Sequence, residues 1–383
     1  MAAIDVVELA RELLRCPSIT PEAAGSFELL EERLKPLGFD THRLTFSEPG
    51  TAPVENLHAR IGDRPPVLAF CGHVDVVPPG DPGRWRHPPF AAAIEDGVLY
   101  GRGACDMKGA IAAFLAATGD FLARHGRNRG SIVLLLTADE EGPAVNGTRK
   151  LLAWLEERGD RLDAALVGEP TCEARLGDTI KIGRRGSLTG FLRVQGRGGH
   201  VAYPRRADNA AHRLLRLLAP LLERPLDAGT EYFEPSSLQI VRIHADAGAT
   251  NVVPAEAEAV FNVRFNDLHT PGGLRRLLRQ RLERGDGEFL LDTSCQAEPF
   301  LTPPGPLSDK LADAIRTVLG RSPELSTGGG TSDARFLRNH CPVVEFGLVN
   351  ATIHQIDERV PLSDLHALRE VYLAFLERFF EAR

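Results

Sequence analysis

Three consecutive acidic residues, Asp139, Glu140 and Glu141, follow directly after the apolar segment SIVLLLTA at residues 131–138. An apolar run of this length is typical of a central strand in a parallel sheet, which is buried on both faces. In open α/β sheets, ligands bind just beyond the carboxyl ends of such strands. Because neighbouring carboxylates repel one another and are costly to desolvate, this cluster indicates a positively charged ligand. The alternative is an acidic turn that is exposed to solvent.

Four further segments carry histidine or acidic residues at the ends of predicted strands or at the start of a predicted helix. They are AFCGHVDVVPPG with His73 and Asp75, GRGACDMKGA with Asp106, ALVGEPT with Glu169, and NATIHQIDE with His354. Taken singly, Asp106 is explained as a helix N-cap, Glu169 as a turn residue and His354 as an ordinary hydrogen-bonded histidine. Their shared position, on the side of the sheet where α/β proteins bind ligands, favours one common site.

The residue types in this set are those of a metal site. Imidazole and carboxylate groups together suit zinc or a similar divalent ion. Residues two apart on a strand face the same way, so we expect the Asp75 carboxylate to accept the second N–H of His73. That hydrogen bond would determine which ring nitrogen of His73 is free to bind a metal.

Charge balance separates the roles of the adjacent acids. Two divalent ions would be neutralised by one hydroxide and three carboxylates, those of Asp106, Glu141 and Glu169. Glu140 is then left over, and a metal hydrolase needs such a base to take the proton from its water. In the turn after a strand, one residue can bind metal while its neighbour faces the water. We therefore assign Glu141 to metal binding and Glu140 to proton transfer.

The first 178 residues alternate predicted strands with predicted helices. Alternation of this kind predicts an α/β fold with a mostly parallel central sheet. We expect strands at 66–77, 131–140 and 163–170, and helices at 28–38, 107–126 and 147–159. The alternation returns after residue 293, with a helix at 311–321, a strand at 342–347 and a closing helix at 362–383.

A different pattern lies between these two stretches. We expect one long strand at 179–196, a helix at 207–224, strands at 237–246 and 256–267, a helix at 272–285 and a strand at 289–294. This β-α-β-β-α-β order is that of the ferredoxin-like sandwich. The sequence therefore predicts a discontinuous metal-binding catalytic domain at 1–178 and 293–383, with a smaller domain inserted at 179–292.

Composition excludes several classes of function. With 43% hydrophobic and 25% charged residues and a net charge of −7, the chain is expected to be a globular protein that binds no nucleic acid. No apolar run is long enough for a membrane span, and the apolar pattern of residues 6–13, which ends before Pro17, predicts a short amphipathic helix rather than a signal peptide. The six cysteines include no CxxC pair, so we expect reduced thiols in a cytoplasmic protein.

In this order, and with an inserted domain, the segments that carry the acids and histidines resemble the M20 family of metallo-aminoacylases and peptidases. The resemblance covers nearly the whole chain and implies two zinc ions per subunit, with cobalt as a possible substitute. It implies that Asp106 bridges the ions, that His73 and Glu169 bind one of them, and that Glu141 and His354 bind the other. It further implies Asp75 as a supporting residue, Glu140 as the general base, and a homodimer built through the inserted domain.

Five motifs resemble those family members that remove a succinyl group from an acylated diamino acid: GDTIKIGRRGSLTG, GGHVAYP, NVVPAEAEAVFNVRF, STGGGTSDARF and VNATIHQIDE. Such a substrate carries three carboxylates, for which planar cationic donors are suited. The predicted substrate-binding residues are Arg184, Arg185, Asn251, Arg264, Thr331, Ser332 and Asn350. His200 is, by the same resemblance, a residue that reaches across the dimer to stabilise the oxyanion. The alternatives are solvated arginines, an ordinary glycine-rich turn at 326–333 and a turn histidine.

Other functions remain to be compared with this one. An acetylornithine deacetylase or another M20 aminoacylase would share the same metal ligands, because only the substrate-side motifs differ. A non-catalytic metal-binding or interaction protein of this fold is disfavoured by the presence of Glu140. A nucleotide-binding oxidoreductase is disfavoured because Asp106 stands where the third glycine of GxGxxG belongs.

Overall fold

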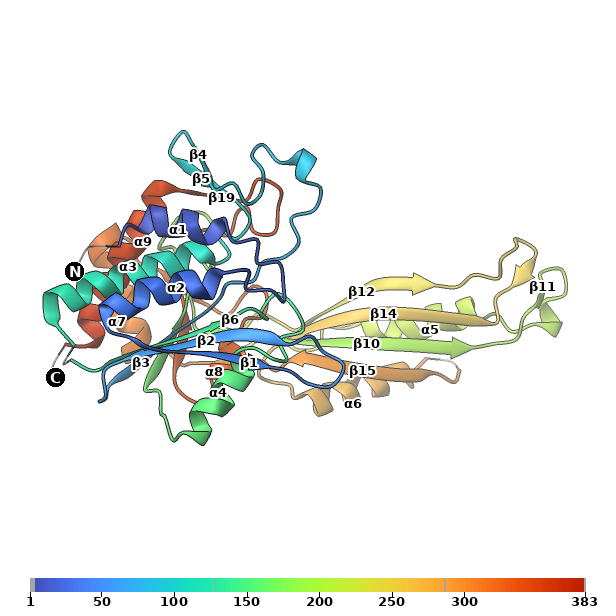
Figure 1. Ribbon diagram of the computed structural model, residues 1–383. Coiled ribbons are helices and arrows are strands. Elements are labelled where there is room, and N and C mark those ends of the chain that lie inside the picture. The colour runs from blue at the N-terminus through green and yellow to red at the C-terminus, as the bar shows by residue number, and fades with distance from the viewer. Residues whose placement is uncertain (1–3, 128, 286, 382–383) are drawn as a thin grey trace. The chain divides into compact units, whose positions relative to one another are not determined.

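The computed structural model describes residues 4–127, 129–285 and 287–381, which form two compact units (Figure 1). The first unit comprises the described residues of Met1–Ile182, Thr302–Ser326 and Ser332–Arg383, and the second those of Gly183–Leu301 and Thr327–Thr331. The breaks in the chain therefore fall four and nine residues later than those expected at 178/179 and 292/293. The glycine-rich segment 327–331, expected in the catalytic domain, belongs to the second unit.

Strand pairing explains where the breaks fall. Strand β8 (Thr179–Lys181) pairs in parallel with β17 (Glu324–Ser326) and so belongs to the large sheet of the first unit. Strand β16 (Phe300–Leu301) pairs with β9 (Gly183–Arg184) and so belongs to the second unit.

The first unit is built on an eight-stranded, mainly parallel sheet, as the alternation of the sequence predicts. Its order is β1-β2-β6-β3-β7-β18-β8-β17, in which β6, β3, β7 and β18 run parallel to one another. The hairpin β1-β2 joins β6 antiparallel at one edge. The remaining bounds are β1 Asp40–Phe46, β2 Val54–Ile61, β3 Val67–His73, β6 Ser131–Thr137, β7 Ala164–Val167 and β18 Val343–Glu345.

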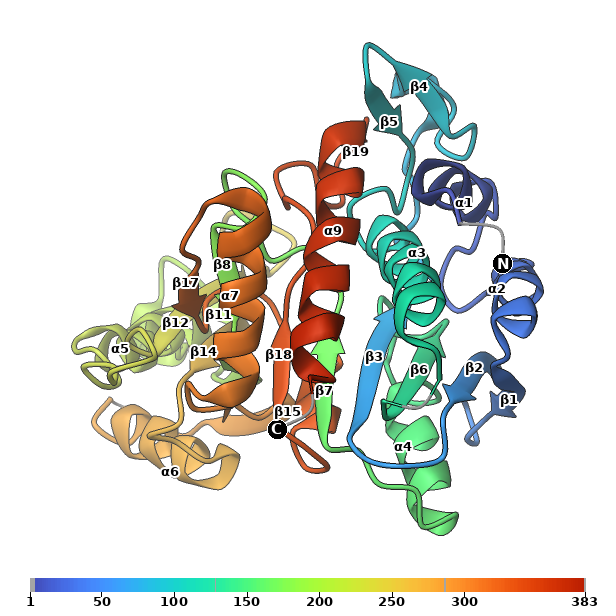
Figure 2. The same ribbon diagram turned by 90° about the vertical axis from the view of Figure 1, so that its left-hand side faces the viewer.

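Helices cover both faces of this sheet. Figure 1 shows α1, α2, α3, α7 and α9 on one face and α4 and α8 on the other, and Figure 2 shows α3, α9 and α7 side by side. Their bounds are α1 Val6–Leu14, α2 Ser26–Leu34, α3 Lys108–His125, α4 Thr148–Glu157, α7 Pro306–Leu319, α8 Ala334–Leu337 and α9 Leu362–Phe379. Short 3-10 turns lie at Lys35–Leu37 and Pro82–Arg84, and a small sheet contains β4 Ala93–Glu95, β5 Val98–Tyr100 and β19 Arg359–Pro361.

The first helix illustrates how local sequence sets these bounds. The Asp5 side chain accepts hydrogen bonds from the backbone N–H groups of Val7 and Glu8, which makes it the N-cap of α1. The apolar stripe from Val6 to Leu14 is buried, as predicted. Among the described residues, no helix is both long and apolar enough to cross a lipid bilayer.

The second unit has the predicted β-α-β-β-α-β order. Its four-stranded antiparallel sheet has the order β12-β14-β10-β15, and α5 and α6 contribute leucines to a common core with it. The bounds are β10 Gly186–Gln195, α5 Ala210–Leu222, β12 Ser237–His244, β14 Glu256–Phe265, α6 Pro271–Leu282 and β15 Leu290–Ala297. A small ladder pairs β11 (Gly199–His200) with β13 (Val252–Val253), and a 3-10 turn lies at Pro204–Arg206.

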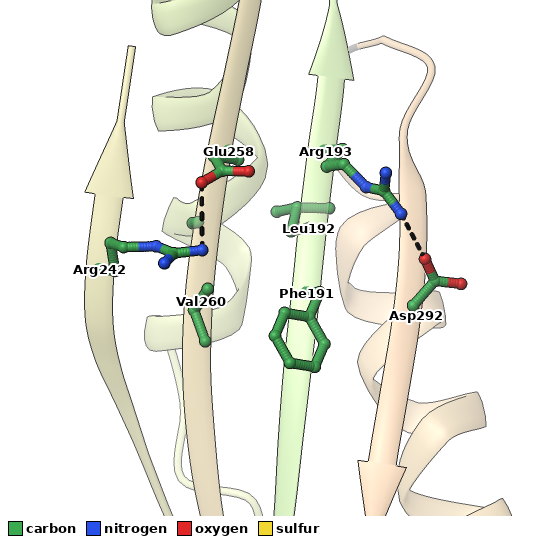
Figure 3. Close-up of a pocket in the computed structure, with 8 residues that line it drawn as sticks. Phe191, Leu192, Arg193, Arg242, Glu258, Val260 and Asp292 are labelled. Atoms are coloured by element: carbon green, nitrogen blue, oxygen red, sulfur yellow. Dashed lines mark hydrogen bonds and ion pairs between the residues drawn. The ribbon is translucent and has the colours of Figure 1, made fainter. Parts of the chain in front are cut away.

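The other face of this sheet carries a shallow hollow of about 270 Å³ (Figure 3). Phe191, on β10, and Val260, on β14, lie between two ion pairs, Arg193–Asp292 at 2.8 Å and Arg242–Glu258 at 3.1 Å. Each arginine is thus paired within the sheet. None of the predicted site residues lines this hollow, so it is separate from the candidate site.

One strand expectation was wrong. Residues 179–196 form three strands, β8, β9 and β10, rather than one. A Cβ at Gly183 would lie 2.3 Å from the Phe300 carbonyl oxygen, and one at Gly186 would lie 2.4 Å from the Phe265 ring. Both glycines therefore allow close approaches where the chain passes between the sheets, and the alternating pattern does not reveal this change of partner.

Candidate metal centre

The sheet brings the ends of three neighbouring strands to one edge. Strands β6, β3 and β7 are adjacent and parallel, so their carboxyl ends point the same way. His73 is the last residue of β3, Asp139 follows β6 after one residue, and Glu169 follows β7 after one residue. The acids and histidines predicted from separate segments therefore meet at the carboxyl edge, where α/β sheets bind ligands.

Asp106 lies between the two histidines. Its Oδ1 is 3.1 Å from Nε2 of His73, and its Oδ2 is 3.2 Å from Nε2 of His354. Nε2 of His354 is also 2.8 Å from Oε1 of Glu141, and Nε2 of His73 is 3.7 Å from Oε1 of Glu169. The two carboxylate oxygens of Asp106 thus face different histidines, which is the arrangement that a bridging carboxylate requires.

The donor atoms converge closely enough to hold metal ions. Those of His73, Glu140 and Glu169 lie within 4.8 Å of one another, and so do those of His73, Asp106 and Glu141. Distances place Glu141 beside His354 and Glu140 on the Glu169 side. They do not by themselves separate a ligand from a base, so the distinct roles of Glu140 and Glu141 stay a proposal.

The electrostatics of the cluster fit cationic ligands. Burial and the neighbouring Glu169 carboxylate raise the pKa of Glu140 well above its usual value. Burial lowers the pKa of His73, but the hydrogen bond and charge of Asp106 outweigh it and raise the pKa well above its usual value. Hydrogen bonds to Asp106 and Glu141 raise the pKa of His354 to about 10. Protons thus offset the carboxylate charge here, which is the role that divalent ions would take over.

Asp75 supports the site differently from the expectation. Nδ1 of His73 donates to the main-chain carbonyl of Asp75 at 2.8 Å, whereas the Asp75 carboxylate is 3.7 Å from the same nitrogen. That carboxylate instead accepts the backbone N–H groups of Glu140, at 3.3 Å, and Glu141, at 3.0 Å. The expected carboxylate–imidazole bond is therefore wrong, although Nδ1 of His73 is still held as a donor and Nε2 still faces the cluster.

Asp139 was given no role by the sequence, and the structure shows one. Its buried carboxylate accepts the backbone N–H groups of Ala144, Val145 and Asn146 at 2.8–3.1 Å. It thereby closes the turn that carries Glu140 and Glu141. An acid followed by a glycine-rich turn is the only signal in the sequence, and it does not distinguish such a role from metal binding.

Two predicted substrate-binding residues lie in the first unit. Ser332 is fully buried, and its hydroxyl donates to the Glu345 carboxylate at 2.9 Å. This hydroxyl is therefore engaged within the protein, and its assignment as a substrate donor stays a prediction. Asn350 is partly exposed and begins the turn that leads to His354.

Six predicted residues lie in the second unit. Arg184 is buried and donates to the Gly330 carbonyl at 3.2 Å, next to Thr331, which is partly exposed. Arg185 pairs with Glu234 at 3.4 Å. Burial and the charge of Arg185 lower the pKa of Arg264, and the structure records no ion pair of Arg264 with the residues it describes.

His200 ends β11, and Asn251 directly precedes β13, its partner in the small ladder. The carbonyl of Asn251 accepts the N–H of Val201 at 3.0 Å, and Nδ1 of His200 accepts the N–H of Ala202 at 3.1 Å. Both residues are exposed. The structure therefore brings the predicted residues of the second unit together in two groups, one around the arginines and one around His200.

A mainly parallel sheet with a histidine–carboxylate cluster at its carboxyl edge is the architecture of a metal-dependent hydrolase. Residues 69–378 match the family described as Peptidase family M20/M25/M40, and the chain belongs to this family. The chain is 54% identical over 378 residues to succinyl-diaminopimelate desuccinylase of Rhodospirillum centenum, covering 99% of this chain and 98% of that protein. It is 55% identical over 379 residues to the protein of the same name from Methylorubrum populi, with 98% of each covered.

Solved structures of the family share the fold at low identity. Aminopeptidase PepT from Bacillus cereus superposes with a TM-score of 0.79 at 18% identity, covering 98% of each chain. A Bacillus subtilis protein described as a dinuclear metal binding peptidase from M20 family superposes with a TM-score of 0.69 at 16% identity, covering 97% of each chain. These similarities confirm the fold class, including the inserted β-α-β-β-α-β unit.

Proposed function

We propose that this protein hydrolyses the amide bond of N-succinyl-L,L-2,6-diaminopimelate to succinate and L,L-2,6-diaminopimelate, a step of lysine and diaminopimelate biosynthesis. Proteins named for this activity match the chain over nearly its whole length, with more than half of the aligned residues identical. The observation that carries the hydrolytic part of the proposal is the approach of His73 and His354 to opposite oxygens of Asp106. The donor types of this cluster fit a metal centre of this kind.

The residues of the site fit two divalent ions, which we propose to be zinc, with cobalt as a possible substitute. His73 and Glu169 would hold one ion, Glu141 and His354 the other, and Asp106 both. Bound ions of this kind lower the pKa of water and polarise a scissile carbonyl. The protein supplies the donor atoms at fixed spacing, and the hydrogen bond from Nδ1 of His73 to the Asp75 carbonyl keeps Nε2 turned toward the cluster.

Glu140 is our candidate for the proton-transfer group. Its carboxylate lies within the cluster beside His73 and Glu169, and its backbone N–H is held by the Asp75 carboxylate. We propose that it takes a proton from the attacking water and delivers it to the leaving amine nitrogen. General acid–base catalysis of this kind contributes about 10²–10⁴-fold in rate.

Arg264 is our candidate for the residue that binds a carboxylate group of the substrate. Its guanidinium is half-buried beside a second cation, Arg185, whereas Glu234, the acid recorded there among the described residues, contacts Arg185. Two neighbouring guanidinium groups with one carboxylate leave an excess of positive charge, which favours an incoming carboxylate. Arg184 is instead engaged with the Gly330 carbonyl and is more suited to shaping the 327–331 segment.

We also propose a homodimer formed through the second unit. Strand β12 is an edge of its sheet, and Val241 and Ile243 on it are 62% and 52% exposed. On α5, Leu215 and Leu222 are 58% and 55% exposed. Pairing of two β12 strands about a two-fold axis would cover both the open edge and these apolar side chains. In such a dimer, His200 would complete the active site of the partner subunit.

A cytoplasmic location is part of the same proposal. All six cysteines are free thiols, four of them buried. Such thiols are retained in reducing compartments. The small-molecule substrate is also an intermediate of cellular biosynthesis.

Comparison of two substrates tests the proposed function. The metal-loaded protein is expected to hydrolyse N-succinyl-L,L-2,6-diaminopimelate and to leave N-acetylornithine essentially unchanged, because only the former carries a carboxylate on its acyl group. Release of the primary amine measures both reactions. Preferential hydrolysis of acetylornithine would reassign the chain to another activity of the family, and turnover of neither would refute the proposal.

A further inference from the structure

Glu358 is fully buried, and its carboxylate collects hydrogen-bond donors from one short segment. Its Oε2 accepts from Nη1 of Arg102, at 2.7 Å, and from the N–H of Gly103, at 3.0 Å. Its Oε1 accepts from the N–H of Cys105, at 2.9 Å, and from the N–H of Asp106, at 3.2 Å. The Cys105 thiol also donates to Oε1 at 3.3 Å. One side chain thus accepts three backbone N–H groups of the turn that ends at Asp106.

The same residue is joined to the other side of the candidate metal centre. His354 lies four residues before Glu358, and its carbonyl accepts a hydrogen bond from Nη2 of Arg102 at 3.4 Å. The main chain at Glu358 is held as well, because its carbonyl accepts the N–H of Gly101 at 2.9 Å. Arg102 and Glu358 therefore connect the Asp106 turn to the His354 turn through a buried, charge-assisted pair.

We propose that Glu358 is a positioning residue that sets the spacing between Asp106 and His354, and with it the affinity of the site for its second metal ion. The inference rests on the proposed metal centre. His354 is the most exposed of the ligand side chains in contact with Asp106, at 46%, so packing alone restrains it little. The hydrogen bonds made by Glu358 and Arg102 hold its turn in place.

A substitution to glutamine removes this restraint with almost no change of shape. Both oxygens of Glu358 accept from at least two donors. In either orientation of the glutamine side-chain amide, its NH₂ group replaces an oxygen that accepted at least two hydrogen bonds. An NH₂ group cannot accept them, so the hydrogen bonds to that oxygen are lost. Loss of a group that orients metal ligands typically weakens metal affinity about 10–100-fold.

The test is a zinc titration of metal-free Glu358→Gln against a competing chelator, beside the unsubstituted protein. We expect the unsubstituted protein to bind two ions, and the variant to bind the weaker of them with about 10–100-fold lower affinity. Hydrogen exchange in the metal-free proteins gives a second measurement. The N–H groups of Gly103, Cys105 or Asp106 should exchange faster in the variant, because they lose their acceptor before any metal is added.

Asp227→Asn is the matched control. The Asp227 carboxylate also holds a loop, accepting the N–H groups of Gly229, at 2.8 Å, and Ser236, at 3.1 Å, but it belongs to the second unit, whereas every proposed metal ligand belongs to the first. This variant should keep the zinc affinity of the unsubstituted protein. Equal losses in both variants would mean general destabilisation and would overturn the proposal.

Two further outcomes are decisive. A folded Glu358→Gln that binds both ions normally would refute the positioning role and leave the proposed function intact. Failure of the unsubstituted protein to bind two ions would instead refute the metal centre itself.

If Glu358→Gln does not fold, Arg102→Lys serves as a second variant. It keeps the positive charge but lacks the second guanidinium nitrogen, which donates to the His354 carbonyl. Weaker binding of one ion by this variant supports the proposal, and unchanged binding refutes it.

Discussion

The buried His58 makes acid stability a quantitative test of the structure. His58 lies on β2, is 4% exposed, and packs against Trp154 and His42 with ring centroids 5.1 and 5.8 Å away. Neither of its ring nitrogens has a hydrogen-bond partner among the described residues. Burial, with a smaller contribution from His42, lowers its pKa from 6.5 to about 4. The folded protein therefore disfavours protonated His58.

The size of the effect follows from this pKa difference. Above pH 6.5 the imidazole is neutral in both the folded and the unfolded chain, so its stabilising contribution is fully present. As the pH falls toward 4, the unfolded chain binds the proton first and the free energy of unfolding decreases. At about 1.4 kcal/mol per pKa unit, the loss between pH 8 and pH 5 is about 2 kcal/mol, and it approaches about 3 kcal/mol below pH 4.

The assay compares urea unfolding of the unsubstituted protein and His58→Phe at pH 8 and pH 5, both metal-free, followed by tryptophan fluorescence. Trp154 packs on His58, so the signal reports on this region. The decrease in unfolding free energy between the two pH values should be about 2 kcal/mol smaller in His58→Phe. His366→Gln, at an exposed position on α9, is the control for loss of any histidine. Equal pH dependence of His58→Phe and the unsubstituted protein would show that burial of His58 does not depress its pKa.

Four further predictions concern the proposed reaction. Chelation should abolish hydrolysis and zinc or cobalt should restore it, whereas full activity of protein shown to be metal-free would exclude a metallohydrolase. Glu140→Gln should keep its metal content but lose about 10²–10⁴-fold in kcat, while Glu141→Gln should lose one ion; the reverse result would exchange the two roles. Arg264→Lys should lower kcat/KM for the succinylated substrate, because an ammonium group cannot form the bidentate contact, and unchanged kinetics would place the carboxylate elsewhere. Mixing inactive Glu140→Ala and His200→Ala subunits should restore roughly a quarter of the active sites if His200 acts in the partner subunit, and no recovery despite subunit exchange would rule this out.

Much of the fold and of the metal centre follows from local sequence. Apolar runs such as 131–138 specify buried central strands, because no exposed element tolerates so many apolar residues in sequence. Because parallel strands run in the same direction, their carboxyl ends lie at one edge of the sheet, independently of how the connecting segments fold. The meeting of His73, Asp106 and Glu169 was therefore predictable from their positions after strands or beside a helix start.

Other features depend on contacts that sequence periodicity does not encode. Strand β1, at the edge of the sheet, has exposed polar positions, and its neighbour β2 carries polar residues such as Asn56 and His58, so both lack the continuous apolar signal of β3 and β6. The long alternating segment at 179–196 changes partner at Gly183, where a close approach to Phe300 decides which sheet each half joins.

Only the tertiary structure shows which acids are held by backbone N–H groups. In sequence, Asp75, Asp139 and Glu358 resemble the proposed ligands, since all are acids in the same motifs. Folding turns their carboxylates toward backbone N–H groups, and a carboxylate saturated by such donors supports a turn rather than facing the site. The sequence alone thus determined which elements form and which residue types gather at the sheet edge. Only folding decides which carboxylates meet backbone N–H donors and so support a turn, because those donors come from segments that the local sequence does not place.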